Sequence, residues 1–186
     1  MTLPHRPASD DRPLTAAPVL ETERLILRGP QPRDAEPLID FLMDRPRAEL
    51  FGAYDNRGDA WRWFALNVGH WHIHGFGYFT VEMKQTGVPA GLCGLWYPEG
   101  WPEPEIGWLV FAGFEGQGIA HEAALRARRW AYEEKGFSTL SSNIKPGNAR
   151  SVALAERMGA VYERSYMNIY MGEEMLYRHP GPEDLS

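Results

Sequence analysis

The spacing of hydrophobic and polar residues predicts a chain of alternating strands and helices. Alternating or continuous apolar runs predict strands at residues 20–28, 76–83, 88–97, 105–112, 138–144, 160–171 and 174–177. Apolar residues three and four positions apart predict helices at 34–43, 57–74, 119–135 and 149–158. The alternation of strands and helices in the second half predicts a mixed sheet with helices on its faces.

A strand, a glycine loop and a helix follow one another between residues 105 and 131. The apolar run ends at Ala112, the loop carries Gly113, Gly116 and Gly118, and the helical pattern begins directly after it. A helix N-terminus directs unpaired backbone N–H groups to one point, and glycines let a bulky anion approach the main chain. We therefore expect a phosphate site at this junction.

Two common phosphate motifs do not fit this loop. A P-loop continues from its second glycine into lysine and then serine or threonine, whereas Ile119 and Ala120 follow Gly118. The dinucleotide fingerprint needs a third glycine at position 121, which is His121. A phosphate-binding kinase or hydrolase and an NAD-binding protein are therefore disfavoured.

Length and composition favour a single globular domain. The 186 residues suffice for one core, and 44% of them are hydrophobic. A net charge of −6 argues against a nucleic-acid-binding surface, and no apolar run is long enough to span a membrane. With no signal peptide and one cysteine, Cys93, we expect a cytoplasmic protein without disulfides. We expect a flexible tail at 1–18, a domain at 19–178 and a C-terminal tail at 179–186.

Three histidines in the predicted helix 57–74 raise the question of a metal site. His70 and His74 are four residues apart and would share a helical face, with His72 between them. No cysteine or carboxylate nearby completes a ligand set, so we expect no metal and favour an aromatic-lined surface, with contact to a substrate as the second alternative.

Three segments resemble the GNAT superfamily of acyl-CoA-dependent N-acyltransferases. The loop Gly116–Ala120 resembles its pyrophosphate loop, although Glu115 stands where glutamine or arginine is usual. Residues 22–28 resemble the first strand of one branch, the ribosomal-protein N-terminal acetyltransferases and their relatives. Asn143 and residues 148–160 resemble the second conserved segment, in which an asparagine opens a helix that ends at glycine.

The resemblance implies an α/β (α+β) fold of one domain. Its central, mixed and mostly antiparallel twisted sheet would have splayed central strands and helices on both faces. It also implies acetyl-CoA as cosubstrate without a metal, and an amine acceptor that is a small molecule or a protein or peptide N-terminus. We expect a monomer or homodimer that binds neither nucleic acid nor membrane.

Acetyl-CoA would bind between the splayed strands. The implied contacts are Leu109, Val110 and Phe111 for pantetheine, Gly116, Gln117, Gly118, Ile119 and Ala120 for pyrophosphate, and Asn143, Asn148 and Ser151 beside them. Lys145 and Arg150 are candidates near the nucleotide phosphates, and ordinary solvated surface charge is the alternative for both.

Glu105 and Ser151 are the candidate catalytic residues. Glu105 opens the central strand and would accept the amine proton, unless it is only a surface charge at the strand end. Many relatives carry a tyrosine acid where this chain has Ala155, so the tyrosine mechanism is not expected. Relatives of the ribosomal-protein branch carry a serine at the position of Ser151, which would donate to the leaving sulfur unless it is only a helix-surface hydroxyl bonded to its own backbone. Because Glu115 and Ala155 depart from the pattern, a catalytically idle acyl-CoA-binding module is the alternative.

Overall fold

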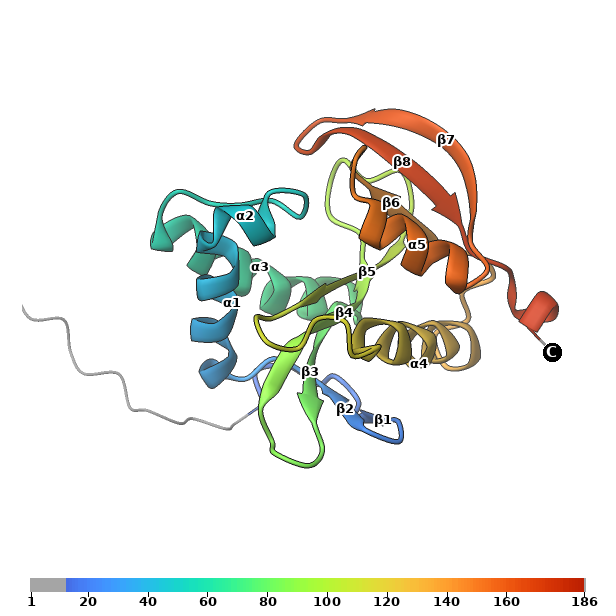
Figure 1. Ribbon diagram of the computed structural model, residues 1–186. Coiled ribbons are helices and arrows are strands. Elements are labelled where there is room, and N and C mark those ends of the chain that lie inside the picture. The colour runs from blue at the N-terminus through green and yellow to red at the C-terminus, as the bar shows by residue number, and fades with distance from the viewer. Residues whose placement is uncertain (1–12, 186) are drawn as a thin grey trace, which may run out of the picture.

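A computed structural model describes residues 13–185, in which one sheet carries helices on both faces (Figure 1). Residues 1–12, the larger part of the predicted flexible tail, lie outside the described residues. The strands are β1 Leu20–Glu21, β2 Leu25–Arg28, β3 Tyr78–Met83, β4 Pro89–Trp96, β5 Glu105–Val110, β6 Ser141–Ile144, β7 Val161–Asn168 and β8 Gly172–Arg178. The helices are η1 Pro32–Asp34, α1 Ala35–Met43, α2 Arg45–Ala48, α3 Arg57–His74, α4 Ile119–Glu133, α5 Ala149–Arg157 and η2 Pro182–Leu185.

The eight strands are ordered β1-β2-β3-β4-β5-β6-β8-β7. All neighbours are antiparallel except β5 and β6, which run parallel. This confirms the predicted mixed, mostly antiparallel sheet. The last strand is longer than the predicted 174–177, because β8 pairs with β6 on one side and β7 on the other.

The two central strands separate almost at once, which confirms the predicted splay. β5 pairs with β4 along its whole length, but its pairing with β6 is limited to Glu105 and Ser141. One residue further on, the hydroxyl of Ser142 donates to the carbonyl oxygen of Ile106 at 2.6 Å. A side chain therefore spans the gap where backbone pairing has ended.

Two hydrophobic clusters cover the two faces of the sheet. One packs α4 against β2, β3, β4 and β5 and includes Phe79, Cys93 and Trp130. The other packs α1 and α3 against the opposite face, with Leu38, Phe64 and Leu109. Cys93 is fully buried, as the sequence predicts for a small core residue.

Other elements also differ from the sequence prediction, among them the predicted strand 160–171, which ends at Asn168 and is followed by a turn. The predicted strand 20–28 is interrupted after Glu21, because the Thr22 hydroxyl accepts from the Leu25 N–H and turns the chain. The predicted strand 138–144 begins only at Ser141, where it meets β5. Helix α2 was not predicted, since its four residues are too few to show a helical period.

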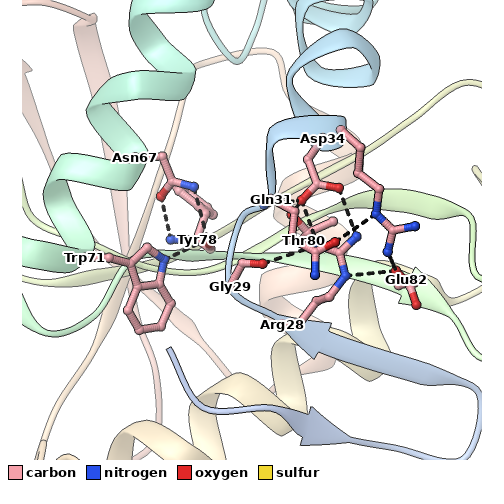
Figure 2. A network of polar contacts seen from close by, with 10 residues as sticks. Arg28, Gly29, Gln31, Asp34, Asn67, Trp71, Tyr78, Thr80 and Glu82 are labelled. Carbon is pink, nitrogen blue, oxygen red and sulfur yellow. Dashed lines mark hydrogen bonds and ion pairs between the residues drawn. The ribbon is translucent and has the colours of Figure 1, made fainter. Parts of the chain in front are cut away.

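A buried ion network fixes the start of the domain (Figure 2). The Arg28 guanidinium donates to both oxygens of Asp34, at 2.7 and 2.9 Å, and to Glu82 at 2.8 Å. Thr80 donates its hydroxyl proton to Asp34 at 2.8 Å. Because Asp34 precedes α1, these bonds attach that helix to β2 and β3.

Side chains of helix α3 hydrogen-bond the main chain of the first residue of β3. Asn67 donates to the Tyr78 carbonyl at 3.1 Å and accepts from the Tyr78 N–H at 2.9 Å, and Trp71 Nε1 donates to the same carbonyl at 3.0 Å (Figure 2). Three bonds to one residue fix the direction of the Tyr78 side chain.

The chain beyond the predicted domain end at 178 is partly buried. His179 lies between Ser142, 2.9 Å from Nε2, and Arg128, 3.3 Å from Nδ1. Burial and the charges of Arg128 and Arg178 lower the pKa of His179 to about 3, so the ring is neutral. No helix among residues 13–185 is long and apolar enough to cross a membrane.

Candidate active site

One continuous groove with a volume of about 1560 Å³ connects the glycine loop with the splayed strands. It passes from the N-terminus of α4, between β5 and the β6–α5 segment, to an aromatic end beneath α1, α2 and α3. Its walls include Gly118, Glu105, Ser151 and Trp63. Residues far apart in the sequence therefore share one site.

The glycine loop presents backbone donors to this groove. Gly113, Gly116 and Gly118 have φ values of 86°, 74° and 76°, which L side chains rarely adopt. The first intrahelical bond of α4 runs from the Glu122 N–H to the Gly118 carbonyl, so the N–H groups of residues 119–121 have no acceptor within the helix. These N–H groups are open to an anion, and the anion site at this junction stays a prediction.

The unusual Glu115 is held away from those donors. Its carboxylate accepts from the Gly113 N–H at 2.8 Å and pairs with Arg47 of α2. Gln117 also turns aside, since its side-chain amide donates to the Gly113 carbonyl at 2.8 Å. Of the predicted loop residues, Gly116, Gly118, Ile119 and Ala120 line the groove.

A second set of contacts attaches the loop to the first strands. Arg24 donates to the Gln117 carbonyl at 3.0 Å and pairs with Glu122 of α4 at 2.6 Å. Glu122 also accepts the Thr22 hydroxyl proton at 2.5 Å. The start of the domain thus supports the glycine loop.

Positive side chains gather at this end of the groove, although the whole chain is acidic. The groove is lined here by Lys145, Arg150 and Arg157, and also by His121. Burial and the charges of Arg157 and Arg128 lower the pKa of His121. The lysine and arginines can attract an anion held by the loop.

The three predicted strand contacts differ in the direction of their backbone N–H and C=O groups. The Phe111 N–H donates to the Ala90 carbonyl at 2.8 Å, so it is directed to β4. Because successive residues of a strand alternate, Trp108 and Val110 direct their N–H and C=O groups to the opposite edge, where β6 has separated. Leu109 and Val110 line the groove, whereas the Phe111 side chain lies in the core beside α1.

Glu105 is buried at the point where the two central strands diverge. It is 7% exposed and accepts three hydrogen bonds: from Trp101 Nε1 at 3.0 Å, and from the Asn143 N–H and Nδ2 at 2.9 and 2.7 Å. Burial raises the pKa of its carboxyl to about 7, against the lowering effect of these donors. A carboxyl that ionises near neutral pH can accept and release protons.

A second carboxylate lies near Glu105. Glu174 of β8 is 4% exposed and lines the same groove. Burial and the negative charge of Glu105 raise the pKa of Glu174 to about 7, while Lys145 acts in the opposite direction. Its cross-strand neighbour Tyr166 has a buried hydroxyl that no described residue hydrogen-bonds.

The α5 segment contributes the remaining predicted residues. Asn148 caps the helix by accepting from the Ser151 N–H at 3.2 Å, and both residues line the groove. Asn143 uses its amide nitrogen on Glu105, and its buried Oδ1 has no partner among the described residues. Ala155, one turn after Ser151, is fully buried in a small cluster with Ile144.

The far end of the groove is aromatic. Trp63 and Trp96 stack with ring centroids 5.4 Å apart, and Tyr78 lies 5.8 and 5.2 Å from them. Phe41, Phe51 and Trp101 also line this end. Burial, and secondarily the charge of Glu105, raise the pKa of Tyr78, so its hydroxyl keeps its proton.

The three histidines do not form a ligand set. His70 is buried, its Nδ1 donates to the Phe76 carbonyl at 2.8 Å, and its Nε2 accepts from the Tyr97 N–H at 2.9 Å. His72 lies 3.0 Å from the Leu14 carbonyl. No group of three potential metal ligands occurs among residues 13–185.

Sequence reasoning missed Glu174, Tyr78 and Arg47. Glu174 and Tyr78 lie in ordinary strand patterns, and Arg47 lies in a helix too short to predict. A weak signal existed for Tyr78, because the glycines at 94 and 107 leave room for a large ring on neighbouring strands.

Comparisons with known proteins agree on one family. Residues 24–161 match the family described as Acetyltransferase (GNAT) domain. The crystal structure of an acetyltransferase from Agrobacterium tumefaciens str. C58 is 33% identical, with a TM-score of 0.81 over 92% of this chain and 99% of that chain. The ribosomal-protein-S5-alanine acetyltransferase of Vibrio fischeri is 16% identical but shares the fold, with a TM-score of 0.66 over 89% of this chain and 97% of that chain.

A curated relative is also similar. The uncharacterized protein YkkB of Bacillus subtilis (strain 168) is 29% identical over 157 residues, which cover 82% of this chain and 90% of YkkB.

Proposed function

Because the chain belongs to the GNAT acetyltransferase family, we propose that it transfers an acetyl group from acetyl-CoA directly to a primary amine. The observation that carries this proposal is the single groove that joins an anion-binding helix N-terminus to a buried carboxylate through the splay of β5 and β6. An elongated substrate with phosphates at one end and a reactive group at the other matches that shape.

The substrate would bind along the groove by its chemistry. Backbone N–H groups at residues 119–121 would bind the pyrophosphate, assisted by Lys145, Arg150 and Arg157. The amide-containing arm would lie beside β5 and pair with the open backbone groups of Trp108 and Val110. Of the strand contacts expected from the sequence, Val110 would pair with the substrate through its backbone. Leu109 would only line the groove.

The transfer needs a neutral amine and a donor for the leaving sulfur. Glu105, directly or through water, would take the proton from the ammonium form, and the nitrogen lone pair would attack the thioester carbonyl carbon. The C–N bond forms, the C–S bond breaks, and the amine loses its second proton. The Ser151 hydroxyl would pass its proton to the CoA thiolate and regain one from the nitrogen, directly or through water, while the proton that Glu105 took would be released to solvent.

A thiol-release assay with a panel of amines tests the proposal. Free CoA thiol should appear only when both acetyl-CoA and an amine are present, and mass spectrometry should detect the acetylated amine. Binding of CoA without turnover on any amine would contradict the proposal and favour an idle acyl-CoA-binding module.

A further inference from the structure

The acceptor end of the groove contains two buried carboxylates whose charges are only partly compensated, by the effect of Lys145 on Glu174. Neither Glu105 nor Glu174 forms an ion pair with any described residue. Glu105 accepts only from neutral donors, and no described donor hydrogen-bonds the Glu174 side chain. Two buried like charges destabilise each other unless a cation lies near them.

The wall beside these carboxylates consists of aromatic rings. Trp63 and Trp96 stack on each other, and the Tyr78 ring lies against both. Aromatic faces attract cations and also bury apolar surface. The pocket therefore combines the two features that bind an organic ammonium ion.

The space around this pocket is limited by three loops. Met171 in the β7–β8 turn lines the groove, and its Cε lies 3.7 Å from a Cβ built on Gly52. The same turn reaches the loop after β4, since a Cβ built on Gly100 would lie 2.9 Å from Ile169 Cδ1. In Figure 1 the β7–β8 hairpin arches above β6 with its turn towards the α2 side. This enclosure favours a compact acceptor over a protein N-terminus.

We propose that the acceptor is a small ammonium compound whose charged nitrogen binds between Glu105 and Glu174. This inference rests on the acetyl transfer proposed above. The aromatic or aliphatic body of the acceptor packs against Trp63, Trp96 and Tyr78. Glu174 is thus a binding residue for the amine, whereas Glu105 takes the proton.

Steady-state kinetics with 2-phenylethylamine and hexylamine test the role of Glu174. Glu174→Gln should raise KM for either amine about tenfold or more, because it removes a buried charge that faces the ammonium group. KM for acetyl-CoA should not change. The matched control is Glu173→Gln, which removes an exposed carboxylate one residue earlier on β8 and should change neither constant.

A neutral isostere separates charge recognition from a structural effect. 2-Phenylethanol should inhibit wild type and Glu174→Gln equally well, since it has no charge to pair. Trp63→Leu should weaken both the amine and the alcohol. Trp61→Leu, which changes an exposed tryptophan on α3, should weaken neither.

The outcomes distinguish this inference from the proposed function. Faster acetylation of a peptide N-terminus than of any small amine would overturn the acceptor class but leave acetyl transfer intact. If no amine is acetylated, calorimetry on the CoA complex decides. If 2-phenylethylamine binds and Glu174→Gln abolishes this binding, the ammonium pocket is supported and the enzymatic function is contradicted. If no such binding is found, both the pocket and the enzymatic function are overturned. Equal behaviour of Glu174→Gln and Glu173→Gln would also overturn the inference.

Discussion

The hydroxyl of Tyr78 lies directly over Gly107, so closely that a Cβ built on Gly107 would overlap it. Tyr78 pairs with Gly94 on β4, and Gly94 pairs with Gly107 on β5, so the tyrosine ring crosses one strand to reach the centre of the sheet. Asn67 holds the Tyr78 main chain from α3 (Figure 2). The wall of the groove formed by Tyr78 therefore requires a residue without a side chain at position 107, two strands away.

Gly107→Ala should displace the Tyr78 ring and damage both stability and turnover. Overpacking of this kind typically costs about 1–3 kcal/mol, which urea unfolding can measure. Tyr78→Phe removes the overlapping hydroxyl, so the double variant should recover part of the lost stability. A double variant no more stable than Gly107→Ala would contradict this contact.

Glu105→Gln should lower kcat by about 10²- to 10⁴-fold, the usual contribution of general acid–base catalysis. Ser151→Ala should cost less, because a thiol with a pKa of about 8.5 leaves fairly well unaided. Calorimetry with CoA should show nearly unchanged affinity in both variants. Full turnover by Glu105→Gln would exclude Glu105 as the base.

The pH dependence of kcat/KM should show an acidic limb near pH 7. Burial raises the pKa of Glu105 to about 7, and only the ionised form accepts a proton, so activity should fall as pH drops through that value. The titratable groups facing this carboxyl are Glu174, Tyr78 and Tyr166. The limb belongs to the coupled carboxylate pair as a whole.

Glu174→Gln should move that limb to lower pH. A negative charge at Glu174 opposes ionisation of Glu105, so its removal lets Glu105 ionise at a lower pH. Lys145 acts on Glu174 in the opposite sense and remains in the variant. A pH profile of Glu174→Gln with an unchanged or raised limb would contradict the coupling, and Glu173→Gln should match wild type.

Gly118→Asp should sharply reduce CoA affinity measured by calorimetry. It adds a side chain and a negative charge at the N-cap of α4, where the phosphates are proposed to bind. Gly136→Asp is the matched control, because Gly136 has a similar φ, 74° against 76°, and follows α4 near its other end. Equal affinities in the two folded variants would make the loop assignment wrong.

Dialysis against EDTA should leave turnover intact, since a thioester is already activated and His70 uses both ring nitrogens in the fold. Burial lowers the pKa of His70. The hydrogen bond from the Tyr97 N–H needs the neutral His70 ring. The stability that this bond gives to the fold is therefore present above the usual histidine pKa and is lost as pH falls through the lowered pKa of His70. Loss of turnover in EDTA, with recovery on zinc addition, would contradict the absence of a catalytic metal.

The sequence by itself determined the elements whose signal is local. The spacing of hydrophobic residues predicted α3, α4 and α5. The glycines at 113, 116 and 118 predicted a helix N-terminus with open N–H donors, because positive φ and capping depend on near neighbours in the sequence. Glu105 could be proposed from its place at the start of a buried strand. The family could be inferred from three short segments, because each of them is a local sequence motif.

Only the tertiary structure decided how the site is assembled. Glu174 comes within reach of Glu105 because β8 inserts between β6 and β7, a pairing that no local pattern predicts. Tyr78 reaches Gly107 across an intervening strand. The raised pKa values of both carboxyls likewise come from burial by distant elements, because desolvation depends on everything packed around a charge and not on its sequence neighbours.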